Sequence, residues 1–296
     1  MKFKNDDNNQ IRDRVGLGWR RELALGILSH LDRIDVVEVI ADDLFDAPRG
    51  ERRALRTLSA QTAVVLHGVS LGLASSVPVE TKLLEKTARL CEEVTPDYWS
   101  EHLAFVRGGG VEIGHLTAPP RTDATIEGAS ANLELARKVV GSAPLVENIA
   151  TLIDPPGSDY DEIDWVNRII YSAPCDLLLD LHNLHANATN FGYDAMEFLI
   201  GLPAERITAV HLAGGKWVEA LGERRLLDDH LHDVPDAIYK LLSELAAMAP
   251  HSLTVVLERD GAYPPIEVLL RQLDRAREAL AEGRSRRFEL IEKEAA

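Results

Sequence analysis

The sequence predicts an α/β protein built as one closed (β/α)8 barrel, and three observations support this class. Eight short β-prone runs occur along the 296 residues. Several are continuous apolar runs, such as AVVL, DLLLDL and LTVVLE, which is typical of strands buried on both faces of a parallel sheet. Stretches with helical periodicity separate these runs. Eight β-then-α units in about 280 residues match a closed barrel better than an open sheet.

The eight strands are expected, in chain order, at 15–19, 36–40, 62–66, 98–104, 145–149, 177–181, 207–212 and 253–257. Four of the segments between or after them carry an apolar stripe at helical spacing, and each stripe predicts a helix that packs on the sheet. The stripes are Leu83, Leu84, Thr87, Leu90 and Cys91; Ala131, Leu133, Ala136, Val139 and Val140; Ile238, Leu241, Leu242 and Leu245; and Ile266, Leu269, Leu270, Leu273 and Ala276.

The domain organisation follows from what interrupts the pattern. No internal linker rich in Pro, Gly or Ser and no low-complexity block breaks the sequence, so it predicts one barrel domain at 11–283. Residues 1–10 are polar, lack the apolar core of a signal peptide, and are expected to be a flexible N-terminus. The charged segment 284–296 is expected to be a frayed tail or a helix that docks on a partner.

Composition limits the partners and the compartment. Hydrophobic residues make up 46% of the chain, which excludes a disordered protein. The 48 acidic residues outnumber the 32 basic ones and give a net charge of -16, so nucleic acid and membrane surfaces are not expected partners. No stretch approaches the roughly 18 apolar residues of a membrane helix. The two cysteines, Cys91 and Cys175, do not suggest a disulfide framework, and this fits a reducing, cytoplasmic location.

Histidines and carboxylates gather where the predicted strands end, the edge that carries chemistry in such barrels. Each of these residues, taken alone, is explained by an ordinary hydrogen bond at the rim. Together, so many carboxylates at one rim would repel one another unless cations neutralise them. Imidazole and carboxylate without thiolate suit iron, manganese or zinc, and the ligand type leaves the choice among these open. The candidate metal ligands are His67, His102, Glu147, Asp180, His182, His211, Asp228, His230 and Glu258.

Four further residues at the same rim are candidates for other roles. Ser70 lies in a G-x-S-x-G pattern after the third strand, but no helix is expected directly after it, so a nucleophile elbow is disfavoured. We instead expect Asp43, Ser70 and Asn183 to contact the substrate. Asp260, two residues past Glu258, is the candidate catalytic residue, as a base behind the ligands or a substrate contact; a surface turn is the alternative.

The chain also resembles a known family. In order, it carries VGLGWR, VEVIADDLF, LHGVSLGLAS, SEHLAF, LVENIATL, LLLDLHNLHANATN, VHLAGG, DDHLHDVP and LERDGAYP, which run from about Gly16 to Pro265. These segments are similar to those of the multinuclear non-heme iron-dependent oxidative enzymes, the family of the methanobactin-biosynthesis oxygenase. The resemblance implies a xylose-isomerase-like (β/α)8 barrel that holds two or three iron ions in mixed Fe(II)/Fe(III) states and uses dioxygen. It also implies oxidation of a residue, mostly cysteine, in a ribosomally made precursor peptide, and a small partner protein that captures the peptide's leader.

Carried onto this chain, the resemblance implies a two-iron core bridged by Glu147 and a third iron site. The core ligands would be His67, His102, Glu147, Asp180, His211 and Glu258, and the third site would use His182, Asp228 and His230. Relatives commonly have asparagine where His182 stands, and imidazole is the stronger ligand. They also usually carry Glu-Asn where this chain has Asp42 and Asp43.

Two other functions remain open from the residues alone. One is a metal-dependent sugar isomerase or endonuclease-like hydrolase on the same barrel. The acidic composition disfavours a nuclease, and the histidine-rich rim disfavours an isomerase with a carboxylate-dominated site. The other is a metal-dependent scaffold without catalysis of its own.

Overall fold

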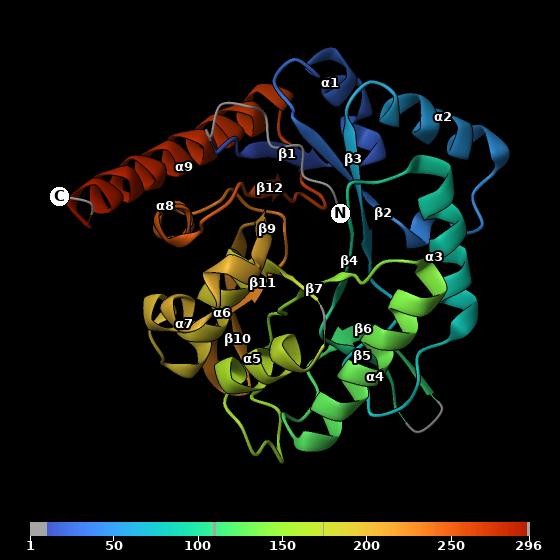
Figure 1. Ribbon diagram of the computed structural model, residues 1–296, viewed down its shortest axis with the longest axis vertical. Helices are drawn as coiled ribbons and strands as arrows, with labels where there is room; N and C mark the ends of the chain where they lie inside the picture. The colour runs from blue at the N-terminus through green and yellow to red at the C-terminus, as the bar shows by residue number, and fades with distance from the viewer. Residues whose placement is uncertain (1–10, 109–110, 174, 295–296) are drawn as a thin grey trace.

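The computed structural model describes residues 11–108, 111–173 and 175–294, and it confirms the barrel (Figure 1). Eight parallel strands close on themselves in the order β1-β2-β3-β4-β7-β8-β9-β12. Because all neighbours are parallel, the carboxyl ends of the strands meet at one rim. The strands are β1 (Arg14–Gly18), β2 (Val36–Ile40), β3 (Ala63–Gly68), β4 (Trp99–His102), β7 (Leu145–Glu147), β8 (Leu177–Asp180), β9 (Ile207–Leu212) and β12 (Thr254–Leu257).

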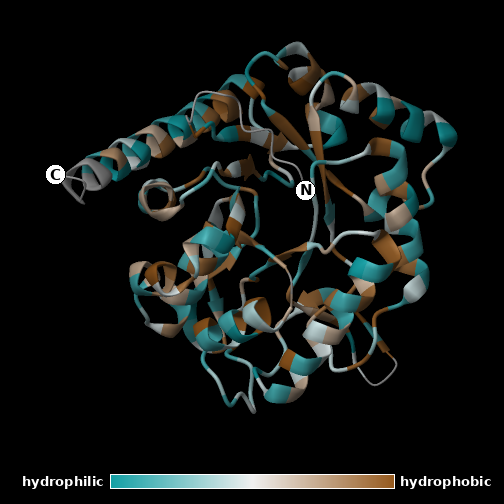
Figure 2. Cartoon of the chain, viewed as in Figure 1, coloured by the Kyte–Doolittle hydropathy of each residue, from teal (hydrophilic) through white to brown (hydrophobic). Residues whose placement is uncertain are grey.

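Helices surround the barrel and bury their apolar stripes against it. Figure 2 shows hydrophobic residues along the barrel strands and both kinds of residue alternating along the helices. The predicted stripes are buried at Leu84, Leu133, Leu242 and Leu270, for example. The helices are α1 (Ala24–Ser29), α2 (Arg49–Ser59), α3 (Thr81–Val94), α4 (Asp123–Val140), α5 (Glu162–Ser172), α6 (Leu181–Phe191), α7 (Ala195–Gly201), α8 (Asp236–Met248) and α9 (Ile266–Glu294), with short 3-10 helices η1 (Arg21–Leu23), η2 (Asp42–Leu44) and η3 (Ala204–Arg206).

Two β-hairpins stand beyond the rim, and the sequence patterns predicted neither. One joins β5 (Phe105–Gly108) to β6 (Val111–Thr117), and the other joins β10 (Gly215–Ala220) to β11 (Glu223–Asp228). The strand expected at 98–104 ends at His102, and its last two residues lead into the first hairpin instead. The second hairpin matters for the site, because β11 ends on Asp228.

The tail expected from residue 284 begins inside a helix. α9 runs from 266 to 294 without interruption across the boundary expected at 283. Arg284 is buried, and its guanidinium donates to the carboxylate of Asp13 and to backbone carbonyls of α8 and the loop after it. These bonds hold the helix against the barrel, so its first turn past 283 is part of the fold. The flexible segment expected at 1–10 lies outside the described residues.

The barrel interior is layered by the two-residue repeat of its strands. An apolar layer fills the middle: Val36, Val65, Tyr98, Leu145, Leu178, Ala209 and Val256. Successive side chains of a strand alternate between its faces, so the residue two positions further on points inward again, one layer nearer the rim. Those next residues are Glu38, His67, Ser100, Glu147, Asp180, His211 and Glu258, all buried. The strand repeat therefore converts an apolar core into a polar layer at the rim.

Candidate metal centre

Six of the predicted ligands lie together at the rim, and we call them the inner centre: His67, His102, Glu147, Asp180, His211 and Glu258. They form two groups whose ligand atoms lie within 4.8 Å of one another. The first group is His67, His102 and Glu147, and the second is Glu147, Asp180, His211 and Glu258. Glu147 belongs to both groups. Each group has the donor set of a metal site.

The carboxylate of Glu147 divides its two oxygens between the groups. Its Oε2 lies 3.3 Å from Nε2 of His67 and 3.4 Å from Nε2 of His102. Its Oε1 lies 3.2 Å from Nδ1 of His211, and that nitrogen is 3.1 Å from Oε2 of Glu258. A carboxylate placed in this way can bind one ion with each oxygen.

The opposite nitrogen of each inner histidine is held by the protein. Nδ1 of His67 lies 2.8 Å from the hydroxyl of Ser100, and Nδ1 of His102 lies 3.2 Å from the carbonyl oxygen of Gly68. Nε2 of His211 lies 2.8 Å from Oε2 of Glu38. Partners of this kind fix the ring orientation and leave the nitrogen that faces the centre free to bind a metal.

The remaining three predicted ligands form a second group, the outer triad: His182, Asp228 and His230. Asp228 lies between the two rings, with Oδ1 2.7 Å from Nδ1 of His182 and Oδ2 2.7 Å from Nε2 of His230. His182 is in the first turn of α6, Asp228 ends β11 and His230 follows in the loop. His230 adopts the left-handed conformation at φ 53°, which is uncommon for a residue other than glycine.

Asp260 lies behind the outer triad. Its Oδ2 is 3.0 Å from Nδ1 of His230, and its Oδ1 accepts a 2.8 Å hydrogen bond from Nε of Arg20. The outer triad is linked to the inner centre through His230, whose Nδ1 is 3.7 Å from Oε2 of Glu258. The geometry of Asp260 is that of a group that orients His230.

Several polar atoms of both groups are buried without a hydrogen-bond partner: Glu147 Oε2, Asp180 Oδ2, Glu258 Oε2, His182 Nδ1, Asp228 Oδ1 and His230 Nε2. Orphaned buried polar atoms are rare because each one loses its hydration without compensation. In the outer triad, the 2.7 Å contact between Nδ1 of His182 and Oδ1 of Asp228 does not have the geometry of a hydrogen bond. Cations bound between these atoms would supply the missing partners, so the residues fit a set of metal ions. Neither cysteine belongs to a candidate ligand group of the described residues.

Without a cation to neutralise the buried carboxylates, some side chains of the inner centre hold their protons to higher pH than usual. Burial, and then the charges of Asp228, Glu147 and Glu258, raise the pKa of Asp180 well above its ordinary value. Burial lowers the pKa of His102, but the carboxylates of Glu147, Glu101 and Glu258 together outweigh burial and raise this pKa to about 9. Metal ions would take the place of these protons.

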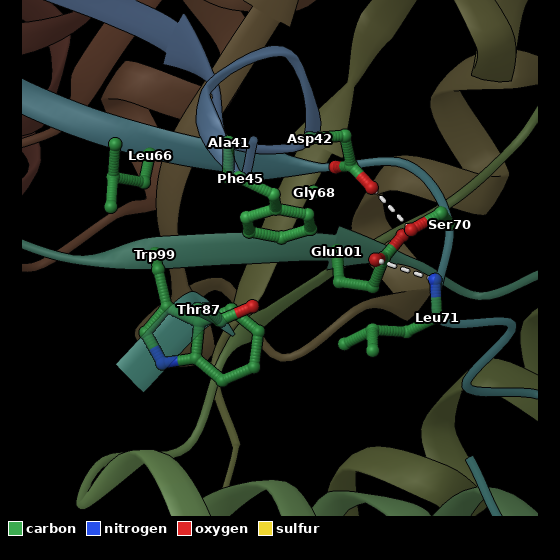
Figure 3. A pocket seen from close by; sticks show the side chains of 10 residues that line it. All are labelled: Ala41, Asp42, Phe45, Leu66, Gly68, Ser70, Leu71, Thr87, Trp99 and Glu101. Atoms are coloured by element: carbon green, nitrogen blue, oxygen red, sulfur yellow. Dashed lines mark hydrogen bonds between the residues drawn. The ribbon is translucent and has the colours of Figure 1, made fainter. Parts of the chain in front are cut away.

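The predicted substrate contacts are spread around the inner centre. The hydroxyl of Ser70 donates to Asp42 (Figure 3). Asp42 also accepts a 3.0 Å hydrogen bond from the amide of Val69. Asp43 is exposed on η2. Asn183 is buried in α6, donates to the carbonyl of Asn148 at 3.0 Å, and keeps its Oδ1 without a hydrogen bond. No helix follows Ser70 until α3, as expected.

Sequence patterns did not single out two buried carboxylates near the centre. Glu38 on β2 is 0% exposed, and Glu101 on β4 is 1% exposed. Glu101 accepts hydrogen bonds from the amides of Leu71 (3.1 Å) and His102 (2.9 Å), and Figure 3 shows its bond to Leu71. The available signal was an acid inside an apolar strand, as in VVEVI, because such an acid requires a partner in the interior.

The fold and the inner centre together define a (β/α)8 barrel with a candidate multi-metal site at the carboxyl ends of its strands. A family model described as RiPP precursor modification enzyme MbnB/TglH/ChrH matches residues 14–281. The chain belongs to this family of enzymes that modify ribosomally made precursor peptides. A UPF0276 protein of Rhizorhabdus wittichii is 33% identical over 249 residues, which cover 83% of this chain and 86% of that protein. A second, of Bordetella bronchiseptica, is 32% identical over 272 residues, covering 91% and 93%.

Solved structures support the xylose-isomerase-like fold. An L-ribulose 3-epimerase matches with a TM-score of 0.56 and 13% identity, covering 96% of this chain and 99% of that one. A xylose isomerase domain containing protein from Salmonella typhimurium matches with a TM-score of 0.56 and 17% identity, covering 92% and 99%. At these identities the likeness establishes the fold and no activity. Among the described residues, no helix is long and apolar enough to cross a membrane.

Proposed function

We propose that this protein is a multinuclear non-heme iron enzyme that uses dioxygen to oxidise a cysteine residue of a ribosomally made precursor peptide. The observation that carries the proposal is the shared carboxylate of Glu147, which faces two histidines with one oxygen and a third with the other. Membership of a family of precursor-modifying enzymes supports the peptide as substrate. The donor set of imidazole and carboxylate suits iron.

In this proposal the inner centre holds two irons and the outer triad holds a third. Glu147 would hold both inner ions, and Asp180 and Glu258, each with a buried oxygen that lacks a hydrogen-bond partner, would be further ligands. His182, Asp228 and His230 hold the outer ion near the mouth of the barrel. When bound, iron supplies the one-electron chemistry through which dioxygen acts as the oxidant.

The other rim residues serve binding and orientation. Asp260 accepts the Nδ1 proton of His230 and thereby turns Nε2 of that ring toward Asp228. Arg20 holds Asp260 in that position. Asn183 offers its free Oδ1 to a peptide backbone amide, and Ser70 and Asp43 contact the peptide on the side of β2 and β3. A small partner protein that captures the leader would deliver the peptide to this mouth.

The proposal also places the reaction in the cytoplasm. Cys91 and Cys175 are both free thiols, and burial raises their pKa values to about 11 and about 12. Thiols held in the unreactive protonated form suit a reducing compartment and add no ligand or nucleophile to the site.

A sugar isomerase or an endonuclease is less well supported. Fold likeness to an epimerase, or to endonuclease IV from Thermus thermophilus at 17% identity, carries no activity to this chain. A barrel of this kind hosts many chemistries, and the site decides among them. Three of the six residues of the inner centre are histidines, which supports an iron site over the carboxylate-dominated site of a divalent-metal isomerase.

The test starts with protein purified without oxygen after expression in iron-supplemented medium. We expect two to three equivalents of iron per chain and little zinc by elemental analysis. The substrate candidate is the product of a short cysteine-bearing open reading frame, sought in the genomic neighbourhood. This peptide should trigger dioxygen uptake and change mass at its cysteine, whereas its Cys-to-Ser version should do neither. One zinc and no iron, or a mass change that needs no dioxygen, would contradict the proposal.

A further inference from the structure

Glu38 is a buried acid inside the barrel that is not among the proposed metal ligands. It points inward from β2, two residues after Val36 of the apolar layer, and is 0% exposed. A carboxylate in such surroundings needs a strong hydrogen-bond partner, because it has lost its hydration. Its partner is His211, whose Nε2 lies 2.8 Å from Oε2 of Glu38 with the geometry of a hydrogen bond.

This bond explains why His211 faces the inner centre differently from the other two histidines. His67 and His102 turn Nε2 toward Glu147. His211 turns Nδ1 toward Glu147 and Glu258, at 3.2 and 3.1 Å. An imidazole has two nitrogens, and a hydrogen bond donated by one of them leaves the other with its lone pair for a metal.

We propose that Glu38 is a positioning residue that fixes the orientation and tautomer of His211, so that this ring binds metal through Nδ1. The inference rests on the metal centre proposed above and is independent of the peptide and of dioxygen. A carboxylate behind a metal-bound histidine is a common arrangement, and removing it typically weakens metal binding roughly 10–100-fold.

The rival role for Glu38 is that of a ligand. Its carboxylate also falls within a group with His67 and His211 whose atoms lie within 4.8 Å of one another, and its Oε1 has no hydrogen-bond partner. However, Nε2 of His211 lies 2.8 Å from Oε2, and in the tautomer that donates this hydrogen bond the proton on Nε2 excludes a metal there. A glutamine at position 38 distinguishes the two roles, because its neutral amide can accept the hydrogen bond from His211 but is a poor metal ligand.

Two variants and one control separate these roles. Glu38→Leu removes the acceptor and keeps most of the volume, and Glu38→Gln keeps an acceptor without the charge. The control, Glu162→Gln, alters a carboxylate on α5 that is 11% exposed and accepts hydrogen bonds from Asn187 and Tyr193. Each metal-free protein is titrated with Fe(II) under anaerobic conditions, and anomalous diffraction at the iron edge gives the occupancy of each position.

For Glu38→Leu we expect Fe(II) affinity roughly 10–100-fold lower at the position bounded by Asp180, His211 and Glu258. Occupancy at the outer triad should stay unchanged, which also shows that the variant folds. Glu38→Gln and Glu162→Gln should remain within a few fold of the unaltered protein. Wild-type affinity in Glu38→Leu would overturn the positioning role, and equal loss in Glu38→Gln would make Glu38 a ligand instead. If the unaltered protein binds no metal, the metal centre itself fails, and this role fails with it.

Discussion

Metal binding to the inner centre should tighten as the pH rises from 6.5 to about 9. Without metal, the pKa of His102 is raised to about 9, because the carboxylates of Glu147, Glu101 and Glu258 together outweigh burial, which lowers it. Below that pH, a metal must displace the proton from the ring before binding it. A rise from 6.5 to about 9 corresponds to about 3 kcal/mol, so we expect up to roughly 300-fold tighter binding at the upper end.

Stability of the metal-free protein should move in the opposite direction. Because the pKa of His102 is higher in the folded than in the unfolded state, its stabilising effect is complete below pH 6.5 and is lost as the pH rises through about 9. The melting temperature of the metal-free protein should therefore fall across this range. The increase in melting temperature on adding metal should grow over the same interval.

Zinc is the suitable probe for this titration, because it keeps one oxidation state. Competition with a chelator gives the affinity at each pH, and calorimetry in two buffers of different ionisation enthalpy counts the protons released. His102→Gln is the matched variant, and it should release one proton fewer. An affinity that is flat or falls between pH 6.5 and 9 would refute the reasoning.

Three further substitutions test how the site is built. Glu147→Gln should remove metal from both inner groups in elemental analysis while the metal-free protein keeps its circular dichroism spectrum, because Glu147 is shared between them. Gly215→Ala should lower metal occupancy at the outer triad alone, since the added Cβ would clash with the carbonyl oxygen of Leu227 on β11 and lie 2.6 Å from the ring of His182, and both must shift; Gly50→Ala, with nothing within 4 Å, is the control. Asn190→Ala should lower the free energy of unfolding by about 1–3 kcal/mol in a denaturant titration, because it leaves backbone groups of β11 unpaired.

The inner centre was predictable because strand periodicity and chemistry coincide there. Each of its residues ends or nearly ends a barrel strand, so topology alone brings the carboxylates of Glu147, Asp180 and Glu258 to one rim. Glu38 belongs to the same layer but was missed because it lies inside an apolar run, two residues before the end of β2. In a buried strand the informative residue is the isolated acid, whether or not it stands at the end.

The hairpins could not be predicted from hydrophobic pattern because they have little core to bury. The first five residues of β6 are exposed, so its sequence VEIGHLT alternates without facing an interior. β10 and β11 are held instead by side-chain bonds from α6, where Asn190 pairs with both backbone groups of Leu226 at 3.0 and 2.7 Å. Such bonds join positions 36 residues apart and have no local signature.

The two parts of the site therefore rest on supports of different stiffness, and this difference bears on function. Ligands of the inner centre lie at or next to the ends of hydrogen-bonded barrel strands, where the ladder fixes their backbone. The outer triad combines a helix, a hairpin end and a loop residue in a left-handed conformation, His230. Loops open locally at lower free energy than core strands. Under the proposed function, an outer ion held in this way would leave or change its ligands more readily than the inner pair, which would suit the position where the peptide enters.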